Sequence, residues 1–202
     1  MRKQLNTHML NFSKAGKKTG EALFAELAFC LFTPQSKAVS CWSAIESLQQ
    51  QKLLMKAGAD KIAPVISAKG VRFKNNKARY LVEAREKVYS SNATQLSRLM
   101  SSFKTPLEAR QWLVKNIKGL GLKEASHFLR NIGRGDDIAI LDRHILKNLV
   151  KLGVIKTVPA TLSKKVYFEI EEKMRAFSKQ TKVPMNHLDL ILWFNETGKI
   201  FK

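Results

Sequence analysis

The stretch IKGLGLK at residues 117–123 decides how the chain is interpreted, because it sets two glycines between two helical patterns. Gly119 and Gly121 allow a tight turn and let a phosphate approach the amides of that turn. The next helix begins here, so its free N–H groups and the positive end of its dipole face the same phosphate. A Gly-x-Gly turn by itself is weak evidence, since a simple helix–helix connection explains it as well.

Lys123 opens the second helix, and Asp142 follows it by nineteen residues. The helix dipole and the neighbouring Lys115, Lys118 and Arg130 favour the neutral amine of Lys123, which is the nucleophile in Schiff-base chemistry. Asp142 precedes a helical run that it can cap. A carboxylate there can also take up a proton and stabilise a positive charge at a sugar carbon. A solvated lysine and a plain N-cap are the simpler alternatives.

The composition indicates a polyanionic partner. The chain has 202 residues, with 36 Lys and Arg against 16 Asp and Glu, and a net charge of +20. This charge is spread along the chain, which favours a folded basic face over a disordered arm. Nucleic acid is the first candidate partner and an anionic membrane surface the second. No helix has the lone apolar face flanked by lysines and tryptophan that surface binding to a membrane requires.

Several classes of protein are disfavoured. Two cysteines, Cys30 and Cys41, cannot build a four-cysteine zinc or iron–sulfur site, and we expect both to be buried free thiols. The apolar run 22–32 is interrupted by Glu26 and is too short to span a bilayer, and residues 1–18 lack the apolar core of a signal peptide. A reduced, cytoplasmic compartment fits these features. We expect a nucleoid-associated protein that requires no cofactor, and a single basic cleft indicates a monomer.

The hydrophobic pattern is helical almost throughout, without a convincing alternating strand, and it predicts an all-α fold of about ten helices. Thr105 and Glu108 form a capping-box pattern that starts a helix running to residue 116. The helix after the hairpin is expected to end at Gly133. The other predicted helices cover residues 20–32, 36–50, 60–68, 74–89, 143–152, 163–179 and 184–197.

We expect these helices to form one unit, residues 1–202, of two lobes with a DNA-binding cleft between them. A middle lobe would span about residues 35–130 and include the hairpin at 117–122. The second lobe would combine residues 1–34 with residues 131–202.

Two histidines are candidates for contact with the partner. Lys123, His127 and Arg130 recur at i, i+4 and i+7, on a face separate from the apolar stripe of that helix. We expect this polar face to point toward DNA. His144 can bond a phosphate, or it can be a partly buried helix histidine.

Longer strings carry a resemblance to a known family. KEASHFLRN at 123–131 and AILDRH at 139–144 closely resemble the second, archaeal and bacterial family of 8-oxoguanine DNA glycosylase/AP lyases. That family belongs to the lysine-bearing branch of the helix-hairpin-helix DNA glycosylase superfamily. ELAFCL at 26–31, AREKV at 84–88 and LILWF at 190–194 are similar as well, so the resemblance spans nearly the whole chain.

The resemblance implies a bifunctional enzyme of base excision repair that flips an oxidised guanine out of the duplex. It implies that Lys123 attacks C1′ and expels the base with help from Asp142, and that β-elimination then nicks the strand on the 3′ side. It further implies that Trp193 stacks on the flipped base and that His127 contacts its other face. Lys202 would distinguish 8-oxoguanine from guanine. From pattern alone, such a tryptophan is more often core and a terminal lysine more often frayed.

The resemblance also implies two further sites. Arg72 and Phe73 match a loop that inserts into the duplex, where an aromatic ring fills the hole left by the base and the arginine meets the estranged cytosine. An ordinary lead-in to a helix fits these two residues equally well. The backbone carbonyls of Lys115, Ile117 and Leu120 are expected to hold a monovalent or divalent cation that bridges to phosphate.

One segment departs from the family pattern. Relatives usually carry LTAN after the second helix, whereas this chain has FTPQS at residues 32–36. The resemblance places this loop at the base pocket, so the details of base readout stay open. Two alternatives also stay open. One is a superfamily enzyme for another oxidised base, such as a pyrimidine. The other is a non-enzymatic DNA-binding module, which would leave Lys123 and Asp142 without a purpose.

Overall fold

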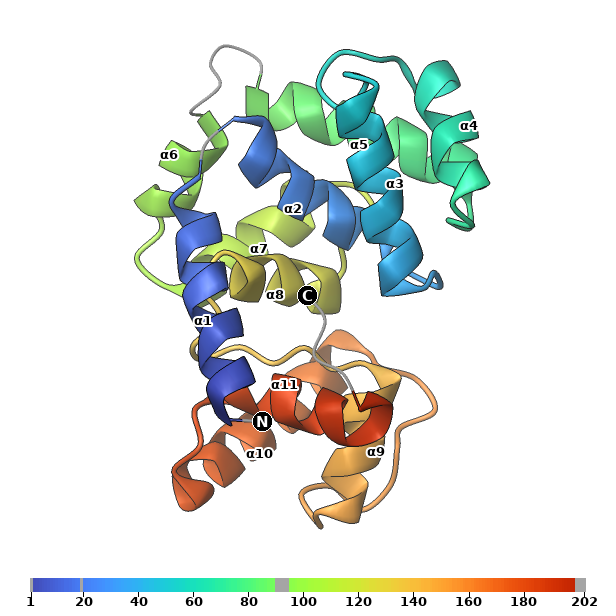
Figure 1. The fold of residues 1–202 in the computed structure, drawn as a ribbon. Helices are drawn as coiled ribbons and strands as arrows, with labels where there is room; N and C mark the ends of the chain where they lie inside the picture. Colours follow the sequence, from blue (N-terminus) through green and yellow to red (C-terminus); the bar gives the residue numbers. More distant parts are fainter. Residues whose placement is uncertain (1, 19, 90–94, 199–202) are drawn as a thin grey trace.

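The computed structural model describes residues 2–18, 20–89 and 95–198, and within them it contains eleven helices and no strand (Figure 1). The predicted all-α class is therefore confirmed. Every predicted helix is present, with bounds that differ from the predicted ones by about one or two residues. The helices are α1 (Arg2–Gly16), α2 (Glu21–Phe32), α3 (Ala38–Gln50), α4 (Ala59–Ala68), α5 (Lys74–Tyr89), α6 (Gln95–Ser102), α7 (Pro106–Asn116), α8 (Leu122–Asn131), α9 (Arg143–Lys151), α10 (Lys164–Thr181) and α11 (Met185–Thr197).

Two of these helices, α1 and α6, were not predicted. Helix α6 has eight residues and buries only Leu96 and Met100. Helix α1 is largely polar, and its buried Leu5 and Phe12 pack with Leu190 of α11. Both helices are stabilised by contacts with distant parts of the chain, and short helices of this kind give little signal of their own.

The buried apolar side chains form two main cores, one in each lobe. The larger core is built from side chains of α2 to α8 and runs along the chain from Leu23 to Ile138. The smaller core is built from residues between Ala139 and Leu192, around α9, α10 and α11. Every residue of α2 from Leu23 to Phe32 is buried, and α2 packs on α3, α5 and α8. The structure thus places α2 in the larger lobe, whereas the sequence-based division put residues 1–34 with the C-terminal helices. A helix that is apolar on all sides belongs in the middle of the largest core.

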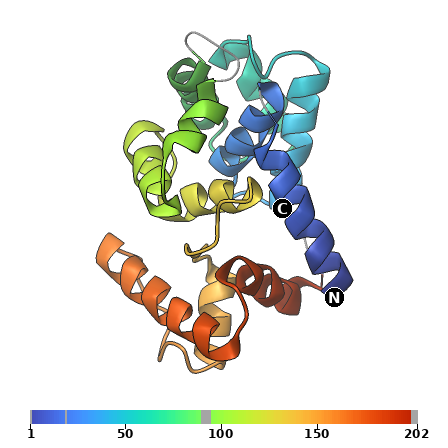
Figure 2. The same cartoon turned by 90° about the vertical axis from the view of Figure 1, so that its left-hand side faces the viewer.

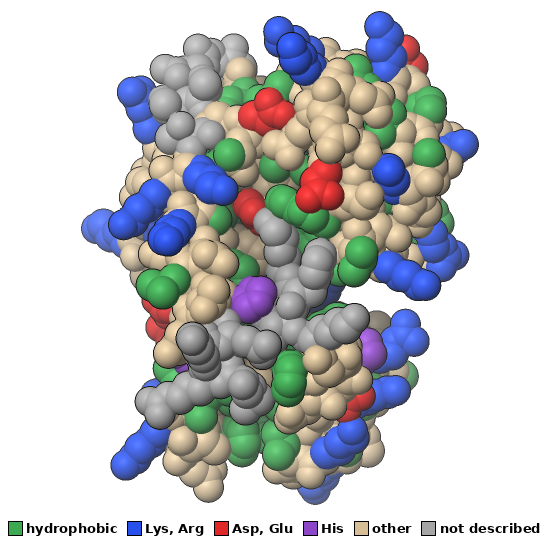
Figure 3. Space-filling view, viewed as in Figure 1, with side chains coloured by type: hydrophobic (Ala, Val, Ile, Leu, Met, Phe, Trp, Pro, Cys, Tyr) green, Lys and Arg blue, Asp and Glu red, His purple; other side chains and the backbone are tan. Residues whose placement is uncertain are grey.

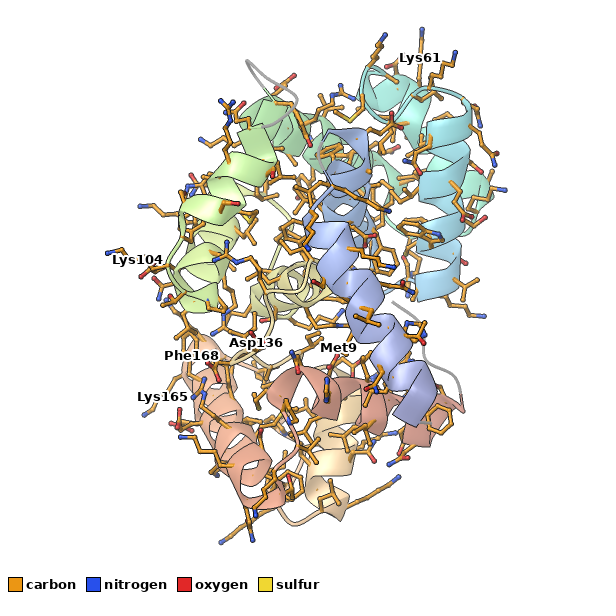
Figure 4. All side chains as sticks on the ribbon, turned by 60° about the vertical axis from the view of Figure 1, so that its left-hand side comes forward. Met9, Lys61, Lys104, Asp136, Lys165 and Phe168 are labelled. Carbon is orange, nitrogen blue, oxygen red and sulfur yellow. The ribbon has the colours of Figure 1, made fainter. Side chains whose placement is uncertain are left out.

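Helix α1 joins the two lobes along one side of the molecule. It packs against α8 in the larger lobe and against α11 in the smaller one. Figure 2 shows α1 running past both lobes, with α10 on the opposite side. Met9, labelled in Figure 4, is one of the side chains of α1 that pack onto this junction.

A buried ion pair joins the lobes on the α10 side. Arg110 of α7 donates to both carboxylate oxygens of Glu171 on α10, at 2.5 and 2.8 Å, and both side chains are almost fully buried. Glu171 also accepts the amide of Ala139 at 2.7 Å, and the Tyr167 hydroxyl donates to the Ala139 carbonyl at 2.6 Å. These bonds fix the linker that crosses from one lobe to the other, on which Figure 4 labels Asp136. The linker ends at Asp142, so its anchoring positions that residue.

Among the described residues, the structure has no helix that is both long and apolar enough to cross a membrane.

Candidate active site

The hairpin between α7 and α8 has the backbone geometry that the glycines predicted. Gly119 has a φ of +90°, and a Cβ there would lie 2.6 Å from the Tyr80 ring, so both its conformation and its surroundings require glycine. The Leu120 amide donates to the Ile117 carbonyl at 3.2 Å and closes the turn. Gly121 is the N-cap of α8 with an ordinary extended backbone. The free amides of the first turn of α8 therefore lie directly after the hairpin, where they can bind a phosphate.

Lys123 lies in the first turn of α8 with 24% of its side chain exposed. Its Nζ is 3.4 Å from Oε1 of Glu124. The other oxygen of Glu124 accepts the Gly121 amide at 3.2 Å, which is the glutamate half of a capping box. The Lys123 amine is thus partly buried and lies next to the Glu124 carboxylate, which is held in place by its bond to the hairpin amide.

Glu124 is a site residue that was not proposed from the sequence. The available signal was its place three residues after Gly121, where a glutamate commonly returns to the N-cap amide. Its second role, beside the Lys123 amine, depends on the direction of its side chain.

Asp142 is the N-cap of α9, as predicted. Its Oδ1 accepts the amides of His144 and Ile145, both at 2.8 Å. Both cap bonds use the same oxygen, so Oδ2 is not needed for the cap. Lys123 forms an ion pair with Glu124 and none within 4.0 Å with Asp142. The predicted pair of Lys123 and Asp142 is therefore not in direct contact in this structure.

His144 and Trp193 lie together although the sequence separates them widely. Their rings meet edge to face with centroids 4.9 Å apart, and both residues are half-buried. Trp193 comes from α11 and His144 from the first turn of α9, which follows Asp142. The partly buried position foreseen for His144 is observed, and its ring is close to the cap of α9.

The polar face predicted for α8 does not point to an open surface, and that expectation is wrong. His127 is 7% exposed and packs its ring on Phe29, with centroids 5.5 Å apart. Arg130 is 5% exposed, lies 3.4 Å from Asp189 of α11 and sits over the Phe12 ring. The reason is that α1, α2 and α11 cover this side of α8. Of the three residues of this face, only Lys123, at the start of the helix, remains partly accessible.

Arg72 and Phe73 are exposed just before α5. Phe73 is 50% exposed and has a φ of +60°, which is a strained conformation for an aromatic residue. The Arg72 guanidinium lies 5.3 Å from the centre of the Phe73 ring. An exposed apolar ring held in a strained turn suits a side chain that contacts a partner.

The surface is hollowed near Lys123. A cavity of about 660 Å³ opens between α7, the start of α8 and α10. Its lining includes Lys115, Lys123, Glu124, Lys164, Tyr167 and Phe168. Figure 3 shows a further hollow between the two lobes at the right-hand edge, with Lys and Arg side chains above and below it. Both hollows offer positive charge to an anionic partner.

Comparisons with known proteins identify the family. The family model described as 8-oxoguanine DNA glycosylase matches residues 5–183. A protein of Fusobacterium nucleatum named 8-oxoguanine DNA glycosylase/AP lyase is 47% identical over 99% of this chain and 94% of its own length. This chain belongs to the 8-oxoguanine DNA glycosylase family.

Solved structures of the family share the fold. The Methanocaldococcus jannaschii 8-oxoguanine glycosylase/lyase, in complex with a 15mer DNA containing 8-oxoguanine, superposes with a TM-score of 0.89. It is 33% identical, and the match covers 100% of this chain and 93% of that one. The Thermotoga maritima 8-oxoguanine DNA glycosylase has a TM-score of 0.87 at 32% identity, over 100% and 92% of the two chains. The fold is therefore the two-lobed helix-hairpin-helix fold of this glycosylase family.

The roles predicted for the site residues stay predictions. Lys202 lies outside the described residues. Among the described residues there is no group of three or more His, Cys, Asp or Glu side chains that could hold a metal ion. The cation predicted at the carbonyls of Lys115, Ile117 and Leu120 would use backbone oxygens and stays a prediction.

Proposed function

We propose that this protein removes 8-oxoguanine from duplex DNA through an imine on Lys123 and then nicks the strand 3′ to the abasic site. The observation that carries this proposal is the placement of Lys123. It is the one partly accessible member of its helical face, it follows the phosphate-binding hairpin directly, and it lines a basic cavity. Membership in the 8-oxoguanine DNA glycosylase family supports the substrate and the reaction.

The first chemical step is attack of the neutral Lys123 amine on C1′ of the flipped nucleotide. The C1′–N9 bond breaks, its electron pair leaves with the base, and the base takes up a proton. We assign to Asp142 the stabilisation of the positive charge that develops at C1′, through the oxygen that the α9 cap does not use. Loss of a proton from nitrogen and opening of the sugar ring then give the imine.

The second step is β-elimination. A base removes a proton from C2′, the C3′–O bond breaks, and the 3′ phosphate leaves with its electron pair. Hydrolysis of the imine then releases Lys123. The carboxylate of Glu124, 3.4 Å from the amine, is placed to exchange protons with it.

We propose that the hairpin amides, His144 and the basic side chains around the two hollows bind the DNA backbone. In this proposal Trp193 contacts the flipped base and Phe73 fills the gap in the duplex, whereas the buried His127 has no open surface for the predicted contact with the base. A cation on the hairpin carbonyls would add to phosphate binding. The protein would act as a monomer at the chromosome.

Release of the base and scission of the strand test the proposal together. The substrate is a duplex with one 8-oxoguanine opposite cytosine, and the same duplex with guanine is its control. The wild-type protein should release the base and should cut only the strand that carries the lesion. Lys123→Gln should do neither, while Lys173→Gln, which removes an exposed charge of α10, should behave as wild type. Release and scission that persist in Lys123→Gln would refute the assignment. Activity on an oxidised pyrimidine and not on 8-oxoguanine would change the assigned substrate and leave the imine mechanism in place.

A further inference from the structure

Lys77 is a buried cation that the proposed mechanism does not use. It lies in the first turn of α5 and is only 4% exposed. Its Nζ donates to the Phe32 carbonyl at 2.5 Å, the Pro34 carbonyl at 2.8 Å and the Ser36 hydroxyl at 3.0 Å. An ammonium group has three N–H donors, so each donor has an acceptor. The acceptors are the last residue of α2 and two residues of the loop that follows it, all within the segment 32–36 that departs from the family pattern.

Ser36 extends this set of bonds to a second segment. Its hydroxyl oxygen also accepts the Arg72 amide, at 3.0 Å. The Lys77 amide in turn donates to the Phe73 carbonyl, at 3.0 Å. We call Lys77 and Ser36, with these bonds, the clamp. The clamp ties the α2–α3 loop to the Arg72–Phe73 turn, about forty residues further along the chain.

Both segments joined by the clamp carry an exposed residue in the left-handed region. Gln35 has a φ of +54° and Phe73 a φ of +60°. Neither is a glycine, so each conformation is costly and persists only where neighbouring bonds hold it. The bonds of the clamp lie next to each of these residues. The clamp therefore fixes the direction in which two exposed side chains leave the surface.

Burial lowers the pKa of Lys77 to about 8; the Cys41 thiol and the Glu124 carboxylate raise it, and the charges of Arg72 and Lys123 lower it further. The three hydrogen bonds of the clamp satisfy the donors of this buried ammonium group.

We propose that Lys77 is a positioning residue that holds the base-pocket loop and the duplex-inserting turn as one unit during base eversion. This inference rests on the proposed function and names a determinant of it. The family resemblance places the α2–α3 loop at the base pocket, and the proposed function places Phe73 in the hole that the base leaves; the clamp keeps the two at a fixed separation. Placement of the base at Lys123 then depends on the clamp. Opening of an abasic site that holds no base depends on it much less.

The test compares two reactions of the same protein. One is single-turnover release of 8-oxoguanine from a duplex, and the other is scission of the same duplex with a ready-made abasic site. Lys77→Met should slow base release about tenfold or more, because small misplacements of a reacting group cost rate steeply, and should change abasic scission less than about threefold. Ser36→Ala keeps the buried ammonium group. It should also slow base release more than abasic scission, but by a smaller factor than Lys77→Met. Lys87→Met removes an exposed charge from the same helix and should leave both rates unchanged.

Equal slowing of both reactions would mean that Lys77 only stabilises the fold, and would overturn the proposal. Unchanged base release in Lys77→Met would overturn it as well. Should Lys77→Met fail to fold, the ratio of the two rates in Ser36→Ala decides, and an unchanged ratio there refutes the clamp. A wild-type protein that releases no 8-oxoguanine would refute the proposed function instead, which is a separate outcome.

Discussion

At the scale of single residues, Asp142 combines a structural and a chemical role. The α9 cap uses Oδ1 alone, which leaves the second oxygen for the sugar. An asparagine in its place keeps an oxygen that can cap the helix and removes the negative charge. The two roles can therefore be separated by substitution.

We expect Asp142→Asn to fold with an unfolding temperature close to wild type and to lose about a hundredfold or more in the rate of base release. Asp142→Ala should lose the same activity and, in addition, roughly 1 kcal/mol of stability, because it removes the cap. Thermal unfolding and single-turnover kinetics of the two variants measure these effects. Near-normal base release in Asp142→Asn would remove the carboxylate from the mechanism.

Local pattern predicted the cap at Asp142 and the accessible Lys123, because both depend on neighbours along the helix. It failed for Arg130, whose partner Asp189 lies in another helix and whose exposure is decided by the packing of α1 and α11. The burial of Lys77 could not be predicted either, since its three acceptors come from the end of α2 and the loop after it, some forty residues earlier.

At the scale of elements, the hairpin depends on glycine at one position more than at the other. Gly119 has a positive φ and a neighbouring Tyr80 ring that leaves no room for a Cβ. Gly121 has an ordinary φ, and a Cβ there would meet only the end of the Glu124 side chain, at 3.0 Å.

Gly119→Ala should therefore cost roughly 1–3 kcal/mol of stability and weaken DNA binding, because the hairpin amides must shift. Gly121→Ala should have a smaller effect on both, since a flexible side chain can move aside. Urea unfolding and titration with a fluorescent duplex measure the two quantities. A larger loss in Gly121→Ala than in Gly119→Ala would contradict this account of the hairpin.

The same contrast explains which elements the sequence could predict. Helices with a long apolar stripe or a capping box, such as α7, were placed within about one or two residues. Helices α1 and α6 were missed, because their few apolar residues become informative only against a partner surface.

At the scale of the whole molecule, the two lobes also meet at a buried pair of opposite charges. Asp189 of α11 faces Arg130 of α8, and burial raises the pKa of Asp189 to about 6, against the attraction of Arg130. Between pH 3.8 and about 6 the folded protein keeps a proton that the unfolded chain releases. The contribution of this proton to stability is therefore lost as the pH rises through that window.

We expect wild-type protein to lose stability relative to Asp189→Asn as the pH rises from 4 to 6.5, by roughly 2 kcal/mol, with no further change above that range. Unfolding of both proteins by urea across this range measures the difference. A difference that is constant with pH, or that grows in favour of wild type, would show that Asp189 is charged throughout.

The overall charge predicted a polyanionic partner, and the periodicity predicted an all-helical molecule with a cleft. The assignment of α2 to the larger lobe did not follow from the sequence, because an apolar helix near the N-terminus can enter either core. It is settled by contacts of α2 with α3, α5 and α8.

The central claim, an imine on Lys123, is tested most directly by trapping with borohydride. The protein is incubated with a duplex carrying one 8-oxoguanine opposite cytosine, and the adduct is sought on a denaturing gel and located by peptide mass. We expect a covalent adduct on Lys123 that is absent from Lys123→Gln. An adduct on another residue, or its persistence in Lys123→Gln, would contradict the claim. No adduct with this duplex or with an abasic one would leave a DNA-binding module in place of an enzyme.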